Sequence, residues 1–217
     1  MSSTILTLVR HGETAANTGG VWHGSTDTKL SPNGEQQAQR LALAMAARIE
    51  ASAIYASDLS RARETARPIA AALGLELRFD DRLREYDLGT WEGKTYRELY
   101  DRHRFWEAIR EDPHFAPHGG ETPIVVAGRF IEGLEDISRR HEGERVVVVT
   151  HGGGLSMALG QILDGDYRSW RRVMKNCAVT ELSLSPPPPE LISFNERWGE
   201  PAEAPEDEPG PVLRRLD

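Results

Sequence analysis

Two short apolar runs, far apart in the chain, each end in a histidine followed by glycine. The first run, Thr4 to Val9, leads into Arg10-His11-Gly12, and the second, Arg145 to Thr150, leads into His151 and three glycines. Both runs are rich in β-branched residues and have the length of a strand. In an open α/β sheet, ligands bind beyond the carboxyl ends of the strands. If these two strands lie side by side, the two imidazoles converge on one pocket.

Each histidine also has a plainer interpretation. Arg10 and His11 could be surface residues after an edge strand. His151 could lie beside a helix N-cap in a βα turn, with its glycines serving only the tight turn. Against this, an arginine beside a histidine, with Gly12 in place of a bulky side chain, suggests an anion site that contains a nucleophile.

The order of the expected elements predicts an α/β fold, a three-layer α/β/α sandwich with a mostly parallel central sheet. Ser31-Pro32 and Thr122-Pro123 are typical helix starts, with a hydroxyl at the N-cap and proline at the first helical position. Ser57 to Ser60 is expected to cap the next helix, with a kink at Pro68. We expect strands at 4–9, 53–56, 75–79, 145–150, 178–185 and 191–194, and helices at 32–49, 60–73, 95–109, 123–141 and 154–163.

The net charge of −8 is concentrated near the C-terminus, where eight acidic and three basic residues lie between Pro186 and Asp217. We expect residues 199–217 to form an acidic, proline-rich, disordered tail. The rest of the chain carries no basic stripe, so nucleic-acid binding is not expected. A homodimer formed through an exposed sheet edge is left open.

The apolar runs are too short for a transmembrane helix, and the N-terminus lacks the pattern of a signal peptide. Cys177 is the single cysteine, which excludes an intrachain disulfide. These features favour a cytoplasmic protein without a membrane partner. The sequence contains neither CxxC nor HExxH, so we expect no metal site.

Seven motifs, taken together and in this order, resemble the histidine phosphatase superfamily, also called phosphoglycerate mutase-like. They cover about residues 4 to 184 and are LVRHGET at 8–14, Asn17, LSPNGEQQA at 30–38, YASDLSRARETA at 55–66, LREYDLGTWEG at 83–93, GGET at 119–122 and VTHG at 149–152. The resemblance implies a histidine phosphatase domain over residues 1–198. It also implies a helical lid insertion at about 86–120 that closes over the site.

The family pattern implies a role for each matching residue. His11 is the expected nucleophile, and it must be neutral to attack phosphorus; nearby arginines lower its pKa, and its second ring nitrogen should donate to a backbone carbonyl. Phosphoryl oxygens would be bound by permanently charged arginines and neutral donors. The expected phosphate-binding residues are Arg10, Asn17, Arg61, His151 and Gly152.

Glu85 is the expected general acid, which later activates water as a base. The residue types alone leave Asp80, Asp81, Asp87 and Glu92 as competitors, and Glu85 is chosen because it matches the family position. His23 and Gly24 are the expected substrate-binding residues, since they fall on a pocket-loop position of the family. The expected partner is a small phosphomonoester, and no cofactor is implied.

The family contains phosphatases and mutases. A mutase must hold a bisphosphate, which favours a basic lid, whereas segment 94–120 interleaves its bases with acids. Gly119-Gly-Glu-Thr122 looks like the phosphatase branch. We therefore predict a phosphomonoester hydrolase that works through a phosphohistidine. Phosphoglycerate mutase is the alternative, followed by a module that binds phosphorylated ligands without turnover.

Overall fold

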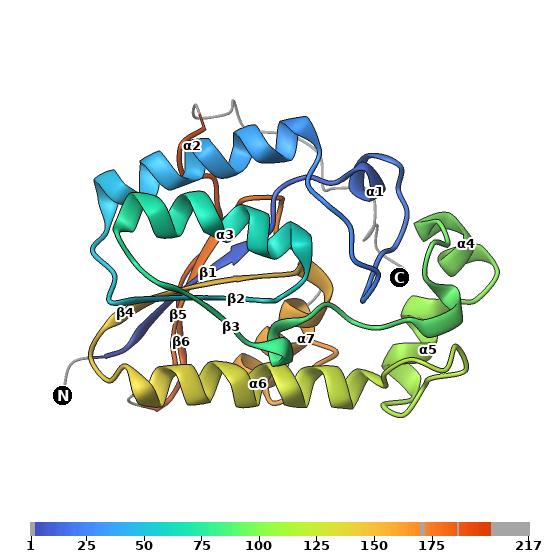
Figure 1. The fold of residues 1–217 in the computed structure, drawn as a ribbon. Coiled ribbons are helices and arrows are strands. Elements are labelled where there is room, and N and C mark those ends of the chain that lie inside the picture. Colours follow the sequence, from blue (N-terminus) through green and yellow to red (C-terminus); the bar gives the residue numbers. More distant parts are fainter. Residues whose placement is uncertain (1–2, 170–171, 186, 201–217) are drawn as a thin grey trace.

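The computed structural model describes residues 3–169, 172–185 and 187–200. Its centre is a six-stranded sheet with the strand order β3-β2-β4-β1-β5-β6 (Figure 1). The strands β1 (Ile5–Arg10) and β4 (Arg145–Thr150) pair in parallel in the middle of the sheet, with Arg10 opposite Thr150. The two runs that end in histidine are therefore neighbours, as predicted.

The remaining strands make the sheet mostly parallel. β2 (Ala53–Ala56) pairs in parallel with both β4 and β3 (Leu77–Phe79). β5 (Val179–Ser183) is antiparallel to β1 and to β6 (Glu190–Glu196). β3 is two residues shorter than predicted. β6 is longer than the predicted 191–194, because its pairing with β5 extends from Glu190 to Glu196.

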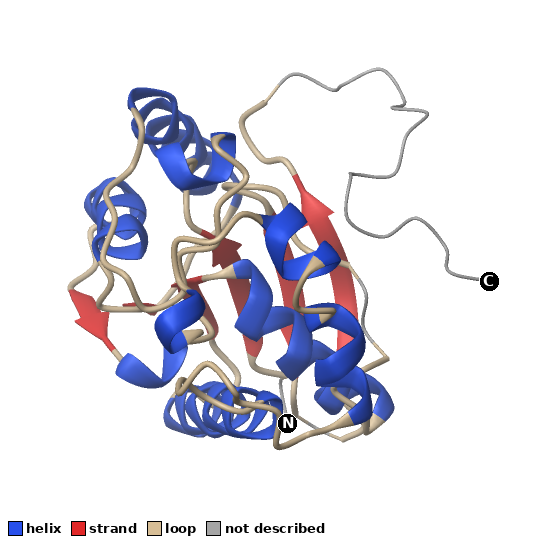
Figure 2. Cartoon of the chain, turned by 90° about the vertical axis from the view of Figure 1, so that its right-hand side faces the viewer, coloured by secondary structure: helices blue, strands red, loops and turns tan. Residues whose placement is uncertain are grey.

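Helices cover both faces of the sheet. α2 (Pro32–Arg48) and α3 (Ser60–Leu73) lie on one face, and α6 (Pro123–Arg140) and α7 (Gly152–Asp164) lie on the other (Figures 1 and 2). β4 supplies both layers in alternation: Val147 and Val149 join the apolar core under α2 and α3, while Val146 and Val148 join the other core. This alternation is the period-two pattern of a strand buried on both faces. The three-layer prediction is confirmed.

Two predicted helix caps are confirmed, and a third is wrong although its helix begins at Ser60 as predicted. Ser31 and Thr122 cap α2 and α6 by accepting a hydrogen bond from the backbone N–H three residues on. α3 instead has Leu59 at its N-cap, which contributes no side-chain bond. The hydroxyl of Ser57 bonds to a histidine and accepts from the N–H of Leu59 at 3.3 Å, ahead of the first turn of the helix. The N–H and hydroxyl of Ser60 donate to Asp27. Contacts distant in sequence replace the local cap that the serines suggested.

The single helix predicted over 95–109 is also wrong. The chain forms α4 (Tyr96–Asp101) and α5 (Phe105–Glu111), separated at Arg104, whose φ is +44°. The break lets Phe105 bury its ring completely against Trp22, at 5.9 Å between ring centroids. Trp22 belongs to a loop more than 70 residues earlier, so local helix propensity could not reveal the break.

Short elements complete the end of the sheet where the parallel strands finish. These are α1 (Ala15–Thr18) and the 3₁₀ turns η1 (Asp81–Leu83) and η2 (Gly89–Trp91). Figure 1 shows α1, α4 and α5 beyond the carboxyl ends of β1 and β4, and Figure 2 looks onto this end. The helices of segment 86–120, which the sequence predicts to be a lid, therefore lie on the side of the sheet where the strands that carry the two histidines end (Figure 1).

The predicted disordered tail falls mostly on residues 201–217, which lie outside the described residues. Gly199 and Glu200 are described, and Glu200 forms ion pairs with Arg40 and Arg197. The preceding Trp198 is buried against the core under α2 and α3. Within the described ranges, no helix combines the length and apolar character needed to cross a bilayer.

Candidate active site

His11 and His151 face each other immediately beyond β1 and β4. Their ring centroids are 5.2 Å apart, with the rings tilted by 58°. This confirms that the two imidazoles share one pocket. Both side chains are buried, with 4% and 0% exposure. Burial, followed by the positive charge of Arg61, holds the pKa of each ring well below its usual value, so both rings are neutral near pH 7.

The orientation of His11 is fixed by its own backbone. Nδ1 lies 2.7 Å from the carbonyl oxygen of Gly12, so Nδ1 carries the proton and donates it to this bond. Nε2 consequently holds the ring's lone pair. The side chain of Asn176 also donates to the carbonyl of His11 at 2.9 Å. The result is a neutral imidazole whose Nε2 carries no proton.

His151 has protein partners at both ring nitrogens. Nδ1 accepts a hydrogen bond from Nε of Arg61 at 3.2 Å, and Nε2 lies 2.8 Å from the hydroxyl of Ser57. Since Nδ1 is an acceptor, the proton of the neutral ring is on Nε2 and is donated to Ser57. The ring is therefore held rigidly beside His11.

The two arginines that the sequence selected differ in how much of each guanidinium is engaged. Arg10 donates from one terminal nitrogen to the carbonyl of Met174 at 2.5 Å, while its buried Nε has no hydrogen-bond partner. Burial lowers the pKa of Arg10 from its usual value. A buried N–H without a partner costs free energy, and a bound anion could accept the hydrogen bond that this N–H does not make within the protein.

Arg61 has a structural task beside its charge. Its terminal nitrogens donate to the carbonyl oxygens of His23, Gly24 and Thr26, at 3.1, 2.6 and 2.9 Å. These bonds fasten the loop between α1 and α2 over the histidine pair. Arg61 thus determines the shape of the pocket as well as its charge.

Asn17 lies on α1 with its oxygen already engaged. Oδ1 accepts from the backbone N–H of Thr14 at 3.1 Å and from the side chain of Asn176 at 3.2 Å. The atom that Asn17 can offer a ligand is therefore Nδ2, a donor, as expected for binding a phosphoryl oxygen. Asn176 was not singled out in the sequence, where it appears only as one polar residue before a strand.

Glu85 lies between η1 and η2 with its carboxyl against the start of α7. Oε1 accepts from the backbone N–H groups of Tyr86 and Gly154, at 2.9 and 2.6 Å, and Oε2 accepts from Gly153 at 2.8 Å. When the carboxyl is ionised, its charge raises the pKa of both Arg10 and Arg61, which shows that the three groups lie close together. The structure thus brings Glu85 to the histidine pair.

α7 begins at Gly152, two residues earlier than predicted, because the glycines take helical conformation instead of forming a turn. A Cβ on Gly152 would lie 3.2 Å from Nε of Arg10. A Cβ on Gly153 would lie 2.8 Å from Oε1 of Glu85. Glycine at these positions lets both functional side chains approach the positive end of a helix.

The predicted substrate-binding residues lie on the loop that Arg61 holds. Nδ1 of His23 is buried without a hydrogen-bond partner. Gly24 has a packing role, since a Cβ there would come within 2.0 Å of the carbonyl oxygen of Tyr86. The lid rings Tyr96 and Trp106 pack against Trp22 of this loop, at 5.9 and 5.6 Å between centroids.

The comparisons with known proteins agree with this geometry. The chain belongs to the histidine phosphatase superfamily (branch 1), whose family model matches residues 6–197. The resemblance drawn from the sequence motifs is therefore confirmed.

The relatives include proteins named as phosphatases and as mutases. The chain is 35% identical to glucosyl-3-phosphoglycerate phosphatase of Mycobacterium tuberculosis, over 84% of this chain and 86% of the relative. It is 34% identical to a probable phosphoglycerate mutase, GpmB, of Enterobacter sp., over 83% and 85%. A solved mycobacterial glucosyl-3-phosphoglycerate phosphatase in complex with VO3 superposes with a TM-score of 0.77 at 32% identity, covering 88% of this chain and 98% of that one.

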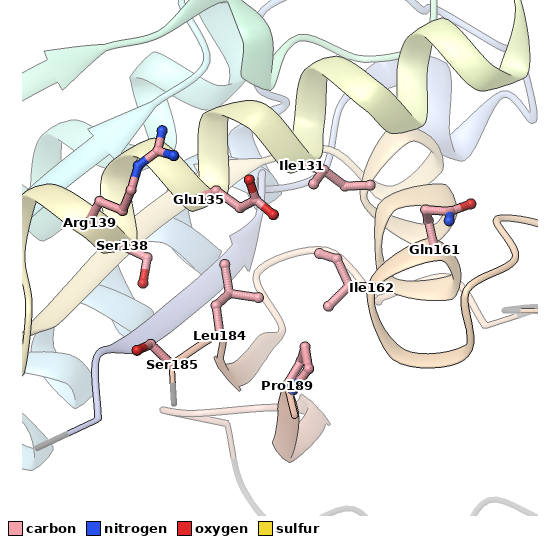
Figure 3. Close-up of a pocket in the computed structure, with 9 residues that line it drawn as sticks. All are labelled: Ile131, Glu135, Ser138, Arg139, Gln161, Ile162, Leu184, Ser185 and Pro189. Atoms are coloured by element: carbon pink, nitrogen blue, oxygen red, sulfur yellow. The ribbon is translucent and has the colours of Figure 1, made fainter. Parts of the chain in front are cut away.

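A separate hollow of about 510 Å³ lies between α6, α7 and the end of β5 (Figure 3). Ile131, Ile162 and Leu184 form its apolar part, and Glu135 and Arg139 are among its other lining residues. It contains none of the residues predicted for the site, so we assign the chemistry to the histidine pair. No group of three or more metal-binding side chains occurs among the residues that the structure describes.

Proposed function

We propose that the protein hydrolyses small phosphomonoesters by way of a phosphohistidine on His11. The observation that carries the proposal is the orientation of this ring. With Nδ1 donating to Gly12 and the pKa lowered by burial and two arginines, Nε2 is a neutral nucleophile aimed into a cationic pocket. Attack on a phosphate dianion needs such a group.

The reaction proceeds in two displacements. First, Nε2 of His11 attacks phosphorus, the phosphorus–nitrogen bond forms, and the bond to the leaving oxygen breaks. Glu85 gives its proton to that oxygen, so an alcohol departs. Next, Glu85 takes a proton from water, whose oxygen attacks phosphorus and displaces His11. Inorganic phosphate leaves, and both residues return to their starting protonation states.

The carboxyl geometry favours Oε2 of Glu85 as the oxygen that carries the proton. Oε1 accepts two backbone N–H groups, from Tyr86 and Gly154, whereas Oε2 accepts one, from Gly153. A carboxyl oxygen with one N–H partner keeps a position at which a proton can be held. The bonds to α7 also hold the carboxyl still, as general acid catalysis requires.

Three donors are best placed to bind the phosphoryl oxygens. They are Nε of Arg10, which has no protein partner, Nδ2 of Asn17, and the N–H of Gly152 at the first position of α7. Arg61 adds charge. His151 joins them only if Nδ1 becomes a donor, which requires that its bond from Arg61 be exchanged and that Ser57 donate to Nε2 in return. The positive charges of Arg10 and Arg61 make a metal ion unnecessary for the proposed steps.

The alcohol part of the substrate is proposed to contact the loop between α1 and α2. His23 has a buried Nδ1 without a hydrogen-bond partner. An oxygen or an N–H of the substrate can form a hydrogen bond with this nitrogen. Gly24 would shape this wall by letting the loop approach Tyr86. We propose these two residues as determinants of substrate choice.

Hydrolysis is favoured over mutase activity by the charges of the lid. Three lid arginines each form an ion pair with an acidic residue close by in sequence, so the lid has a mixed charge and not the basic surface that a second phosphate favours. The pairs are Arg97 with Asp101, Arg102 with Glu98, and Arg104 with Glu107. A mutase must hold a second phosphate and keep water away from the phosphohistidine.

The test is an assay of phosphate release over a panel of p-nitrophenyl phosphate, 3-phosphoglycerate, glucosyl-3-phosphoglycerate and phosphoserine. Radiolabelled substrate should leave acid-labile, alkali-stable phosphate on the wild-type enzyme and none on a His11→Asn variant. Bisphosphate-dependent interconversion of phosphoglycerates, without release of phosphate, would show a mutase instead. Binding of phosphorylated ligands with neither label nor turnover would show a binding module.

A further inference from the structure

The backbone that carries Glu85 lies outside the regular helices and the sheet. Buried carbonyls in such a segment need side-chain donors. The carbonyl oxygens of four successive residues, 82–85, receive hydrogen bonds from two side chains. Thr150 donates from Oγ1 to Leu83 at 2.8 Å, and Arg129 of α6 donates to the other three. A single arginine on a neighbouring helix therefore sets the course of this segment.

Arg129 uses all five N–H groups of its guanidinium. One terminal nitrogen donates to the carbonyls of Arg82, at 2.9 Å, and Arg84. The other donates to the carbonyl of Glu85 at 2.9 Å and to Oε2 of Glu121 at 2.7 Å, and Nε donates to Oε1 of Glu121 at 2.6 Å. Lysine cannot reproduce this planar fork.

Glu121 extends the same clamp along the chain. Its N–H donates to the carbonyl of Asp87 at 3.0 Å, and its Oε2 accepts from the N–H of Asp87 at 3.2 Å. The side chains of Arg129 and Glu121 are only 17% and 23% exposed. The backbone on both sides of Glu85 is thus held by one largely buried ion pair.

The Glu85 side chain is held from a different direction, by the N–H groups at the start of α7. The position of Oε2 therefore depends on the backbone clamp from α6 and the carboxyl clamp from α7 together. We propose that Arg129 is a positioning residue for proton transfer by Glu85. This inference rests on the proposed function, because it assigns to Arg129 the alignment of the acid that the hydrolysis uses.

A positioning role differs from a purely structural one in its dependence on the leaving group. Departure of p-nitrophenolate, a weak base, needs little protonation, whereas departure of an alkoxide depends on Glu85. The value of kcat/KM reports the steps up to phosphoryl transfer to His11, so later hydrolysis of the phosphohistidine does not enter it. Misplacement of Glu85 should therefore lower kcat/KM for an alkyl phosphate far more than for p-nitrophenyl phosphate.

The experiment compares wild type, Arg129→Lys and Arg129→Gln on p-nitrophenyl phosphate and on the best alkyl phosphate of the panel. A displacement of about 1 Å can cost about a hundredfold in rate. We expect kcat/KM to fall about a hundredfold for the alkyl phosphate and less than about threefold for p-nitrophenyl phosphate. Arg145→Lys is the control, because Arg145 pairs with Glu181 at the opposite end of β4. It should leave the ratio of the two substrates unchanged.

A double variant with Glu85→Gln completes the test. If Arg129 acts through Glu85, its replacement in the Glu85→Gln background should have almost no further effect on the alkyl phosphate. Equal losses on both substrates, or additive losses in the double variant, would overturn the inference. Wild-type protein that releases phosphate from neither substrate would instead count against the proposed function. Should both Arg129 variants fail to fold, Glu121→Gln, which weakens the same clamp, is tested for the same change in ratio.

Discussion

Arg61 donates from Nε to Nδ1 of His151 at 3.2 Å, and this bond determines which nitrogen of His151 carries the proton. The proton is on Nε2 and is shared with the hydroxyl of Ser57, at 2.8 Å. Because a hydroxyl can both donate and accept, Ser57 can satisfy Nε2 in either tautomer. In the proposed reaction, Ser57 would therefore allow His151 to become a donor at Nδ1 toward a phosphoryl oxygen.

Ser57→Ala should slow the enzyme without abolishing it. Loss of one orienting hydrogen bond, of about 1 kcal/mol, corresponds to about a fivefold fall in kcat/KM. Ser52→Ala is the matched control, because Ser52 lies just before the other end of β2 and donates to the carbonyl of Arg145 on the surface. Steady-state kinetics on p-nitrophenyl phosphate measure both variants. Wild-type kcat/KM in Ser57→Ala would show that the reaction does not need Ser57 to satisfy Nε2 of His151 in either tautomer.

Arg61→Lys should reduce both activity and stability, because Arg61 binds three loop carbonyls as well as supplying charge. Lysine keeps the charge but cannot hold both this loop and Nδ1 of His151, and a displacement of about 1 Å in the pocket can cost about a hundredfold in rate. Leaving buried carbonyls without donors should lower the free energy of unfolding by about 3 kcal/mol. Kinetics and urea unfolding test the two effects separately. Arg67→Lys, on an exposed position of α3, should change neither.

The central part of the site could be predicted from the sequence because each prediction rested on a local pattern. The β-branched run 145–150 is buried on both sides wherever it pairs, so His151 had to emerge at a strand end. The same reasoning placed His11, and the pairing of β1 with β4 brought the two rings to 5.2 Å.

The parts that were predicted wrongly or not at all depend on partners distant in sequence. Arg129 belongs to the polar side of an amphipathic helix, and nothing near it indicates that its fork meets carbonyls 44 or more residues earlier. Ser57 looked like a helix cap because its partner, His151, is 94 residues away. The break at Arg104 reflects the packing of Phe105 on Trp22. Such contacts are determined by the folded topology.

Gly153→Ala should impair catalysis although it improves helix propensity. The new Cβ would lie 2.8 Å from Oε1 of Glu85 and 2.9 Å from Cη2 of Trp22, so the carboxyl must move. We expect at least a tenfold fall in kcat/KM for an alkyl phosphate. Gly128→Ala is the control in α6, where a Cβ meets no atom within 4 Å. It should stabilise the fold by about 1 kcal/mol and leave kinetics unchanged. Normal activity of Gly153→Ala would contradict the placement of Glu85.

Stability should fall as the pH drops below about 6.5, the unperturbed value for histidine. Burial, then Arg61, lowers the pKa of His11 and His151 in the folded state, so the unfolded chain binds protons first. The free energy of unfolding then decreases with falling pH, by up to about 1.4 kcal/mol per pH unit for each histidine, until the folded pKa is reached. Above about pH 7.5 both states are neutral at these residues, and the effect disappears.

Urea unfolding at pH 7.5, 6.0 and 5.0 measures this dependence. The carboxyls with lowered pKa, such as Asp58 and Asp80, would destabilise the fold only below about pH 4, outside this window. His118 is also buried, and burial lowers its pKa, so three imidazoles contribute to the slope. His11→Asn should therefore remove up to about a third of the slope, because one of these imidazoles no longer titrates in the unfolded chain. Equal stability at pH 7.5 and 5.0 would show that the two rings take up protons as readily in the folded protein, and a neutral nucleophile at His11 would then be lost in mild acid.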